Sequence, residues 1–144
     1  MTASNPVFGV GPGMYAEVVD RETRQQGIHL MYLGTHNAYL QVSSESGLPG
    51  LFFYTATLVL TLRMNWRLVK RIRGKPALAE LNAMAFATLI ATIGYAAASA
   101  FHHLAYTRHL PLLAGMTLAL WTIGSRLTGN STADGRKLGA RGGN

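Results

Sequence analysis

The stretch "AMAFATLIATIGYAAASAF", residues 83–101, decides the fold class of this chain because it contains nineteen residues and no charged side chain. A helix needs about 20 apolar residues to cross the hydrocarbon core of a bilayer. Two shorter apolar segments flank this stretch, at residues 48–62 and 110–124. Each can be extended if the charged side chains beside it reach the membrane surface. We therefore expect three transmembrane helices, at about 48–66, 77–101 and 110–127.

The composition favours membrane insertion over a soluble helical bundle. Of the 144 residues, 49% are hydrophobic and only 13% are charged, whereas a soluble domain carries about 25% charged residues. The three apolar segments also lack the polar stripe of an amphipathic helix. The absence of cysteine excludes disulfides and thiolate sites. We predict an all-α polytopic membrane protein, with three transmembrane helices after an extracytoplasmic helical and loop segment at residues 1–47.

The distribution of charge predicts the orientation of the spans. The net charge is +7, and "RMNWRLVKRIRGK", residues 63–75, contains six basic residues and no acid. The first 47 residues carry four acids and two arginines, and the loop at 102–109 has one arginine. Since basic loops stay in the cytoplasm, these two regions are expected outside. The basic loop is then a topology signal that also contacts membrane lipids, and no nucleic-acid partner is expected.

The two ends of the chain are predicted to be loops or short helices. The C-terminal residues 128–144 are rich in glycine and polar residues, and we expect a disordered cytoplasmic tail. Near the N-terminus, "NPVFGVGPGMY" at 5–15 lacks the spacing of a nucleotide-binding loop and predicts a tight turn. A helix from Tyr15 to Arg24 should follow it. Its arginines either pair with acids one turn away or bind a phosphate.

The segment before the first span carries the most distinctive motif. It reads "THNAYLQVSSESGLPG", residues 35–50, and places nine residues between its His-Asn pair and its Gly-x-x-Gly. This pattern closely resembles the signature of the O-antigen ligase and polymerase superfamily. These bacterial inner-membrane enzymes transfer undecaprenyl-diphosphate-linked glycans. The "GVGPG" turn at 9–13 and the spans after the motif also resemble that family.

The resemblance implies a role for each polar residue of the motif. His36 would be the catalytic base, since a neutral imidazole can remove the proton of an acceptor hydroxyl. Asn37 would orient the histidine or hydrogen-bond the glycan. Glu45 would bind sugar or hold the loop. If residues 36–47 formed one helix, Glu45 would lie about half a turn away from His36, so the two would not act as a simple pair.

Other residues complete the implied site. Arg24 is the candidate for binding the substrate diphosphate, and Gly47 and Gly50 would turn the chain into the membrane. Neither a cofactor nor a metal is expected. The histidines predicted on the outer side have no carboxylate spacing that supports a metal site, and they would instead face a polar cavity. Their positions are His29, His36, His102, His103 and His109.

The predicted function is that of the C-terminal part of an O-antigen ligase-like glycosyltransferase, because family members are longer and contain more spans. Its donor would be an undecaprenyl-diphosphate-linked glycan. Its acceptor would be a hydroxyl group, that of lipid A-core for a ligase. The alternatives are a fragment of an O-antigen polymerase or of a protein O-oligosaccharyltransferase. The alternative from a different functional class is a small membrane protein without catalytic activity that packs against partner helices.

Overall fold

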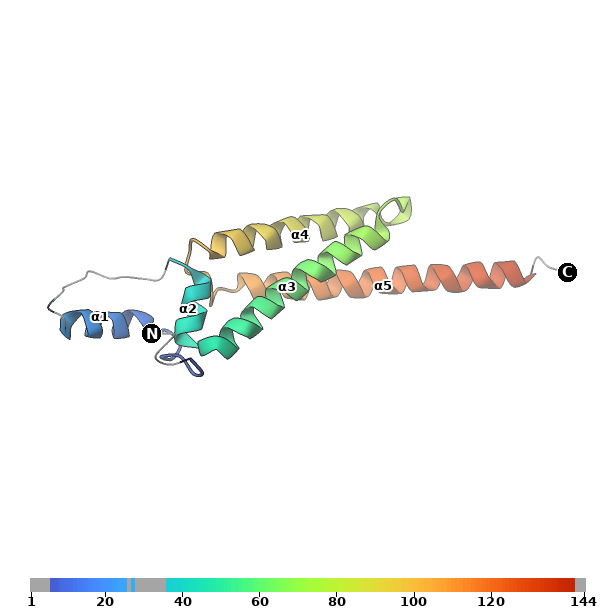
Figure 1. The fold of residues 1–144 in the computed structure, drawn as a ribbon. Helices are drawn as coiled ribbons and strands as arrows, with labels where there is room; N and C mark the ends of the chain where they lie inside the picture. Colours follow the sequence, from blue (N-terminus) through green and yellow to red (C-terminus); the bar gives the residue numbers. More distant parts are fainter. Residues whose placement is uncertain (1–5, 26, 28–35, 142–144) are drawn as a thin grey trace.

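The structure is a computed structural model that describes residues 6–25, 27 and 36–141. Within these residues it consists of helices joined by short loops (Figure 1). The helices are α1 (Tyr15–Gln25), α2 (Ala38–Glu45), α3 (Gly47–Ile72), α4 (Ala79–Ser99) and α5 (His109–Arg141), with a 3₁₀ turn at Pro76–Leu78.

Three helices are long and apolar enough to span a membrane, which confirms the predicted fold class. They are α3, α4 together with its 3₁₀ turn, and the His109–Thr128 part of α5. Helix α3 continues to Ile72, beyond residue 66, where the first span was predicted to end. Arginine and lysine are good helix formers, and their long side chains reach the membrane surface from inside a helix. Helix α3 therefore continues through its basic residues.

The C-terminal segment also differs from the prediction of a disordered tail. Helix α5 runs without a break through Arg141. No proline follows Pro111 in the sequence, and a helix that has already formed adds one hydrogen bond with each further residue. These two facts account for the continuation, in which the transmembrane part of α5 acts as the nucleus.

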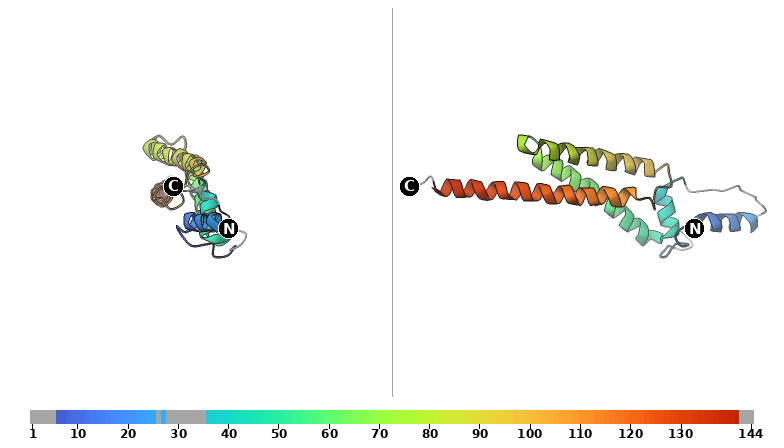
Figure 2. Two further views of the ribbon diagram at one scale, coloured as in Figure 1. Left: turned by 90° about the vertical axis from the view of Figure 1, so that its left-hand side faces the viewer. Right: turned by 180° about the vertical axis from the view of Figure 1, so that it is seen from behind.

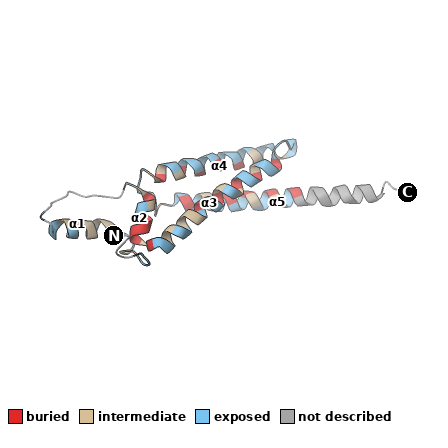
Figure 3. Cartoon of the chain, in the orientation of Figure 1, coloured by how far each residue is buried: buried red, intermediate tan, exposed pale blue. Residues whose placement is uncertain are grey.

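The spans pack into a bundle whose two ends differ. Helices α4 and α5 run alongside each other, α3 crosses them obliquely, and α2 lies across one end (Figures 1 and 2). We call this the α2 end. At the other, basic end, α3 finishes in the basic residues of 63–75. Buried residues lie mainly where helices face one another, whereas exposed ones follow the outer surfaces (Figure 3). Those exposed apolar surfaces suit contact with lipid.

Two apolar clusters hold the bundle together, one toward each end. Leu68, Ile72, Ala85 and Leu120 form the cluster toward the basic end. Leu58, Tyr95 and Leu110 form the other. Each cluster draws residues from α3, α4 and α5, so both tie all three spans together.

A polar contact joins α3 and α5. Asn65 is fully buried, and its Nδ2 donates hydrogen bonds to Thr117 Oγ1 at 2.7 Å and to the Thr61 carbonyl at 3.1 Å. Interhelical hydrogen bonds of this kind help spans associate where the hydrophobic effect cannot. The Asn65–Thr117 bond therefore fixes the register of α3 against α5.

Replacing Asn65 and Thr117 with alanine, singly and together, should reveal a coupling free energy of about 0.6–1.7 kcal/mol. The two side chains share one hydrogen bond, so the second substitution should cost less once the first is present. Reversible unfolding of the protein in mixed detergent micelles measures the four free energies. Thr122→Ala is the matched control, because the Thr122 hydroxyl bonds the Leu118 carbonyl of its own helix. If Asn65 were coupled to Thr122 as strongly as to Thr117, the hydrogen bond between Asn65 and Thr117 would be contradicted.

Candidate functional site

The His-Asn pair lies at the start of α2, where asparagine caps the helix. Asn37 Oδ1 accepts hydrogen bonds from the N–H groups of Tyr39 at 2.9 Å and Leu40 at 3.0 Å. Asparagine is among the best N-cap residues and stabilises a helix by about 1 kcal/mol relative to alanine. The cap has an extended backbone with φ of −152°. Helix α2 therefore begins at Ala38, and His36 lies outside it.

This placement excludes a single helix over 36–47, the case in which Glu45 would lie about half a turn away from His36. His36 is exposed and lies outside α2, whereas Glu45 is its last residue. The Asn37 side-chain oxygen is engaged by the cap, which leaves its amide nitrogen for either of the roles predicted for it. The histidine is thus held next to a rigid, capped helix without being part of it.

Glu45 is the last residue of α2 and is only 2% exposed. Its Oε2 has no hydrogen-bond partner among the described residues. The next residue, Ser46, has its hydroxyl 3.2 Å from that of Tyr106 in the α4–α5 loop. Desolvation of the phenol, the largest cause, and the nearby Glu45 carboxyl raise the pKa of Tyr106, although the Ser46 hydrogen bond opposes them. The carboxyl group therefore faces the protein interior near this loop.

The loop at residues 6–14 precedes α1 in the chain, and its backbone hydrogen-bonds both the end of α2 and the beginning of α3. Val10 N–H donates to the Ser44 carbonyl at 2.8 Å, and Gly11 N–H donates to the Glu45 carbonyl at 3.0 Å. Leu48 N–H donates to the Pro6 carbonyl at 2.8 Å. Carbonyls at a helix C-terminus and amides at a helix N-terminus lack partners within the helix. The loop supplies those partners to both helices at once.

The sequence predicted only a tight turn for this loop. Its glycine spacing was the available signal, because Gly9, Gly11 and Gly13 all have positive φ, a conformation that glycine adopts at little cost. Gly47, at the α2–α3 break, has φ of 70°. Three residues later, a Cβ at Gly50 would overlap that of Ser46. The motif glycines thus lie where the chain turns into the first span.

Tyrosines attach α2 to the spans. The Tyr39 hydroxyl donates to the Ala96 carbonyl of α4 at 3.0 Å, and its ring meets that of Tyr54 edge-on with centroids 5.7 Å apart. Desolvation, followed by the proximity of Tyr95, raises the pKa of Tyr39. Tyr54 continues the network, with its hydroxyl 3.1 Å from that of Tyr95. These contacts were not predicted, because they join positions far apart in the sequence.

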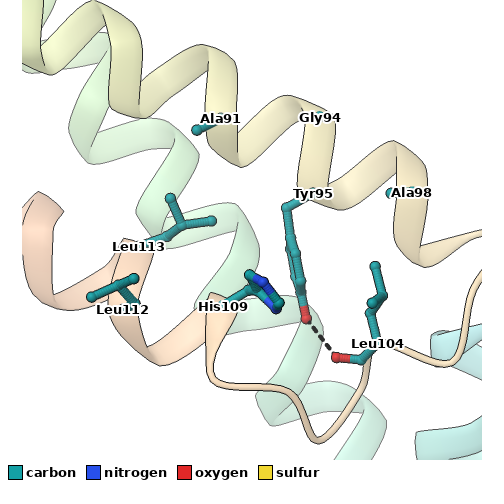
Figure 4. Close-up of a pocket in the computed structure, with 8 residues that line it drawn as sticks. All are labelled: Ala91, Gly94, Tyr95, Ala98, Leu104, His109, Leu112 and Leu113. Atoms are coloured by element: carbon teal, nitrogen blue, oxygen red, sulfur yellow. Dashed lines mark hydrogen bonds between the residues drawn. The ribbon is translucent and has the colours of Figure 1, made fainter.

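A cleft of about 340 Å³ lies between α4 and α5 toward the α2 end (Figure 4). The Tyr95 ring lies beside the His109 ring, with centroids 6.2 Å apart. The Tyr95 hydroxyl donates to the Leu104 carbonyl at 3.0 Å. Tyr95 thus both packs in the apolar cluster toward the α2 end and lines this cleft. The lining residues are Ala91, Gly94, Tyr95, Ala98, Leu104, His109, Leu112 and Leu113.

Arg24 lies on α1, which extends away from the bundle beyond α2 (Figure 1). Its Nε is 2.9 Å from Asp20 Oδ2, and Arg21 pairs with Glu17 in the same way at 3.5 Å. These exposed i,i+4 pairs agree with the first of the two alternatives for the arginines. Arg24 as a ligand for diphosphate stays a prediction.

Among the described residues, no group of three or more His, Asp or Glu is placed to hold a metal ion. His29 lies outside the described residues. No family model matches the sequence, and neither a curated protein nor a solved structure matches it. The function must therefore be inferred from the site and from the motif.

Proposed function

We propose that this chain takes part in transferring an undecaprenyl-diphosphate-linked glycan to an acceptor hydroxyl, as an O-antigen ligase does, with lipid A-core as the acceptor. The main support is the position of His36. This exposed imidazole immediately precedes a capped helix that lies across one end of a membrane-spanning bundle. A base in that place would be able to reach a lipid-linked donor whose diphosphate lies in the headgroup region.

The proposed reaction needs one base and one site for the leaving group. The acceptor oxygen attacks the anomeric carbon of the glycan while His36 removes its proton. A new carbon–oxygen bond forms, and the bond from the sugar to the diphosphate breaks. The electron pair of that bond leaves with the lipid diphosphate, whose growing negative charge requires cationic or N–H groups.

Arg24 is the proposed cationic group for the diphosphate. Its ion pair with Asp20 is exposed on both sides, and such pairs contribute only about 0–1 kcal/mol. Exchanging a single carboxylate for a diphosphate therefore costs little. A guanidinium can also bind phosphate oxygens with two parallel hydrogen bonds.

The charge of the bundle supports placing the α2 end outside the cytoplasm. The basic end carries six basic residues at 63–75, with Glu80 as the next acid along the chain. Positive loops are retained in the cytoplasm. The basic end would then face the cytoplasm, and His36 would face the periplasm of a bacterial inner membrane, where donor and acceptor meet.

Expression of the full chain in bacteria that lack their own O-antigen ligase tests the proposal. We expect glycan to appear on lipid A-core, seen as a ladder of larger lipopolysaccharide bands. Longer lipid-linked glycan would indicate a polymerase instead, and glycosylated protein would indicate an oligosaccharyltransferase. Because the chain is expected to be the C-terminal part of such an enzyme, the expression is repeated with the N-terminal spans of an O-antigen ligase in the same membrane. If no glycan moves in either case, the proposal is wrong and the non-catalytic alternative stands.

A further inference from the structure

The loop at residues 6–14 exposes apolar side chains beside the first span. Phe8 is 86% exposed and Val7 is 55% exposed. The loop has the sequence "PVFGVGPGM", in which no side chain is charged or can donate a hydrogen bond. Single exposed apolar residues are common on protein surfaces. Nine consecutive residues without a charged or donor group, with two adjacent apolar side chains exposed, need a different explanation.

Hydrogen bonding fixes this loop at the height where α3 enters the membrane. The Pro6 carbonyl accepts from Leu48 N–H in the first turn of α3. Helix α3 has 26 residues, about 39 Å at 1.5 Å per residue, whereas the hydrocarbon core is about 30 Å thick. The helix is therefore long enough for its first turn to reach the headgroup region. Val7 and Phe8 lie two or fewer residues from that anchored carbonyl.

The surroundings of the loop continue the lipid-facing surface of α3. Leu48 and Phe52, in the first two turns of α3, are exposed apolar residues. Part of the loop backbone is hydrogen-bonded, because the amides of Val10, Gly11 and Met14 donate to carbonyls. Moving a backbone into lipid is costly when its polar groups lack partners. These three bonds reduce that cost, and an interfacial depth leaves the other backbone groups of the loop near the headgroups.

We propose that Val7 and Phe8 insert into the bilayer at the α2 end and anchor the loop to the membrane surface. The partner is the boundary between headgroups and acyl chains of the leaflet that α3 enters, and the expected depth is about 5–10 Å, as for interfacial helices. The same loop holds the last carbonyls of α2. Insertion would therefore also fix α2 close to the membrane surface. This anchor does not depend on glycan transfer.

Spin labelling of the full-length protein in vesicles of phosphatidylethanolamine and phosphatidylglycerol can test the proposal. The absence of cysteine means that each engineered cysteine carries the only label. Val7→Cys reports on the loop with Phe8 in place. Glu22→Cys on the exposed surface of α1 is the aqueous control, and Phe86→Cys on the exposed surface of α4 is the lipid control.

Collisions with oxygen, which concentrates in lipid, and with a water-soluble nickel chelate give the depth of each label. The label at residue 7 should resemble the label at residue 86 more than the label at residue 22, with high oxygen accessibility and low nickel accessibility. Adding Phe8→Asp should raise its nickel accessibility toward that of the label at residue 22. The labelled Val7→Cys protein with Phe8 intact tests insertion by itself. The Phe8→Asp variant then tests whether Phe8 drives that insertion.

Two results would overturn the anchor. High nickel accessibility at residue 7 with Phe8 present would place the loop in water. Low accessibility to both reagents would show that a second copy or another protein covers it. In contrast, a change in depth on adding Phe8→Asp, with the labels at residues 22 and 86 unaffected, would support insertion driven by the phenylalanine.

Discussion

Replacing Gly47 with alanine should lower the free energy of unfolding by about 2–5 kcal/mol, because the substitution adds backbone strain and overpacking at one position. Gly47 has φ of 70°, and a Cβ there would overlap the Val7 carbonyl and lie 2.9 Å from the Pro6 oxygen. Those atoms belong to a backbone that is hydrogen-bonded to α2 and α3. The loop must therefore move, and both helix ends lose partners when it does.

Two other glycines separate strain from crowding. Gly74 has φ of 78° with no atom within 4 Å of its added Cβ, so Gly74→Ala should cost only the left-handed strain, about 1–2 kcal/mol. Gly115 is helical with equally open surroundings, and Gly115→Ala should be neutral or stabilise by up to about 1 kcal/mol. Unfolding in mixed micelles compares the three variants. A Gly47→Ala cost no larger than that of Gly74→Ala would refute the close packing of the loop.

His36→Ala should lower the rate of glycan transfer by about 100- to 10,000-fold, the usual contribution of a general base. His36→Gln should lose as much, because an amide can accept a hydrogen bond but cannot take the proton. His36 is exposed and lies outside α2, so neither variant should change the free energy of unfolding. The rate is measured as the initial formation of glycosylated lipid A-core in vesicles that contain donor and acceptor.

Variants at two other positions show whether the loss is specific to the His36 side chain. His102 is exposed in the α4–α5 loop, and His102→Ala should transfer glycan at close to the wild-type rate. Asn37→Asp keeps a side-chain oxygen for the N-cap of α2, so it should retain the stability of the helix. If His36→Ala transferred at the wild-type rate, the assignment of His36 as the base would be wrong. Gly47→Ala should differ from His36→Ala, because it should lower the free energy of unfolding as well as the rate of transfer.

The three spans could be predicted because apolar length is a local property of the sequence. A window such as residues 83–101 contains all that is needed to satisfy its backbone inside lipid, since a helix forms its hydrogen bonds within itself. The ends were less predictable. Helix α3 continues through Arg67 and the basic residues that follow it. Long charged side chains can reach the membrane surface while the backbone stays helical.

The motif likewise predicted roles for the residues of the candidate site. Asn37 was expected to orient His36 or to hydrogen-bond the glycan, and that role stays a prediction. The sequence did not reveal that its oxygen would cap α2, because helix boundaries depend on one or two residues whose side chains compete with the backbone. The burial of Glu45 was also missed. A carboxyl group next to a membrane span is expected in water unless the fold covers it.

The sequence by itself determined that the chain is helical, that three of its segments are long and apolar enough to span a membrane, and that a His-Asn motif precedes the first of them. Only the tertiary structure decided how that motif is held. The backbone of residues 6–11 supplies partners to α2 and α3, and Tyr39 donates to the Ala96 carbonyl 57 residues away. Backbone groups are alike in almost every residue. The sequence pattern therefore shows that they need partners, and the packing of distant segments determines which partners they find.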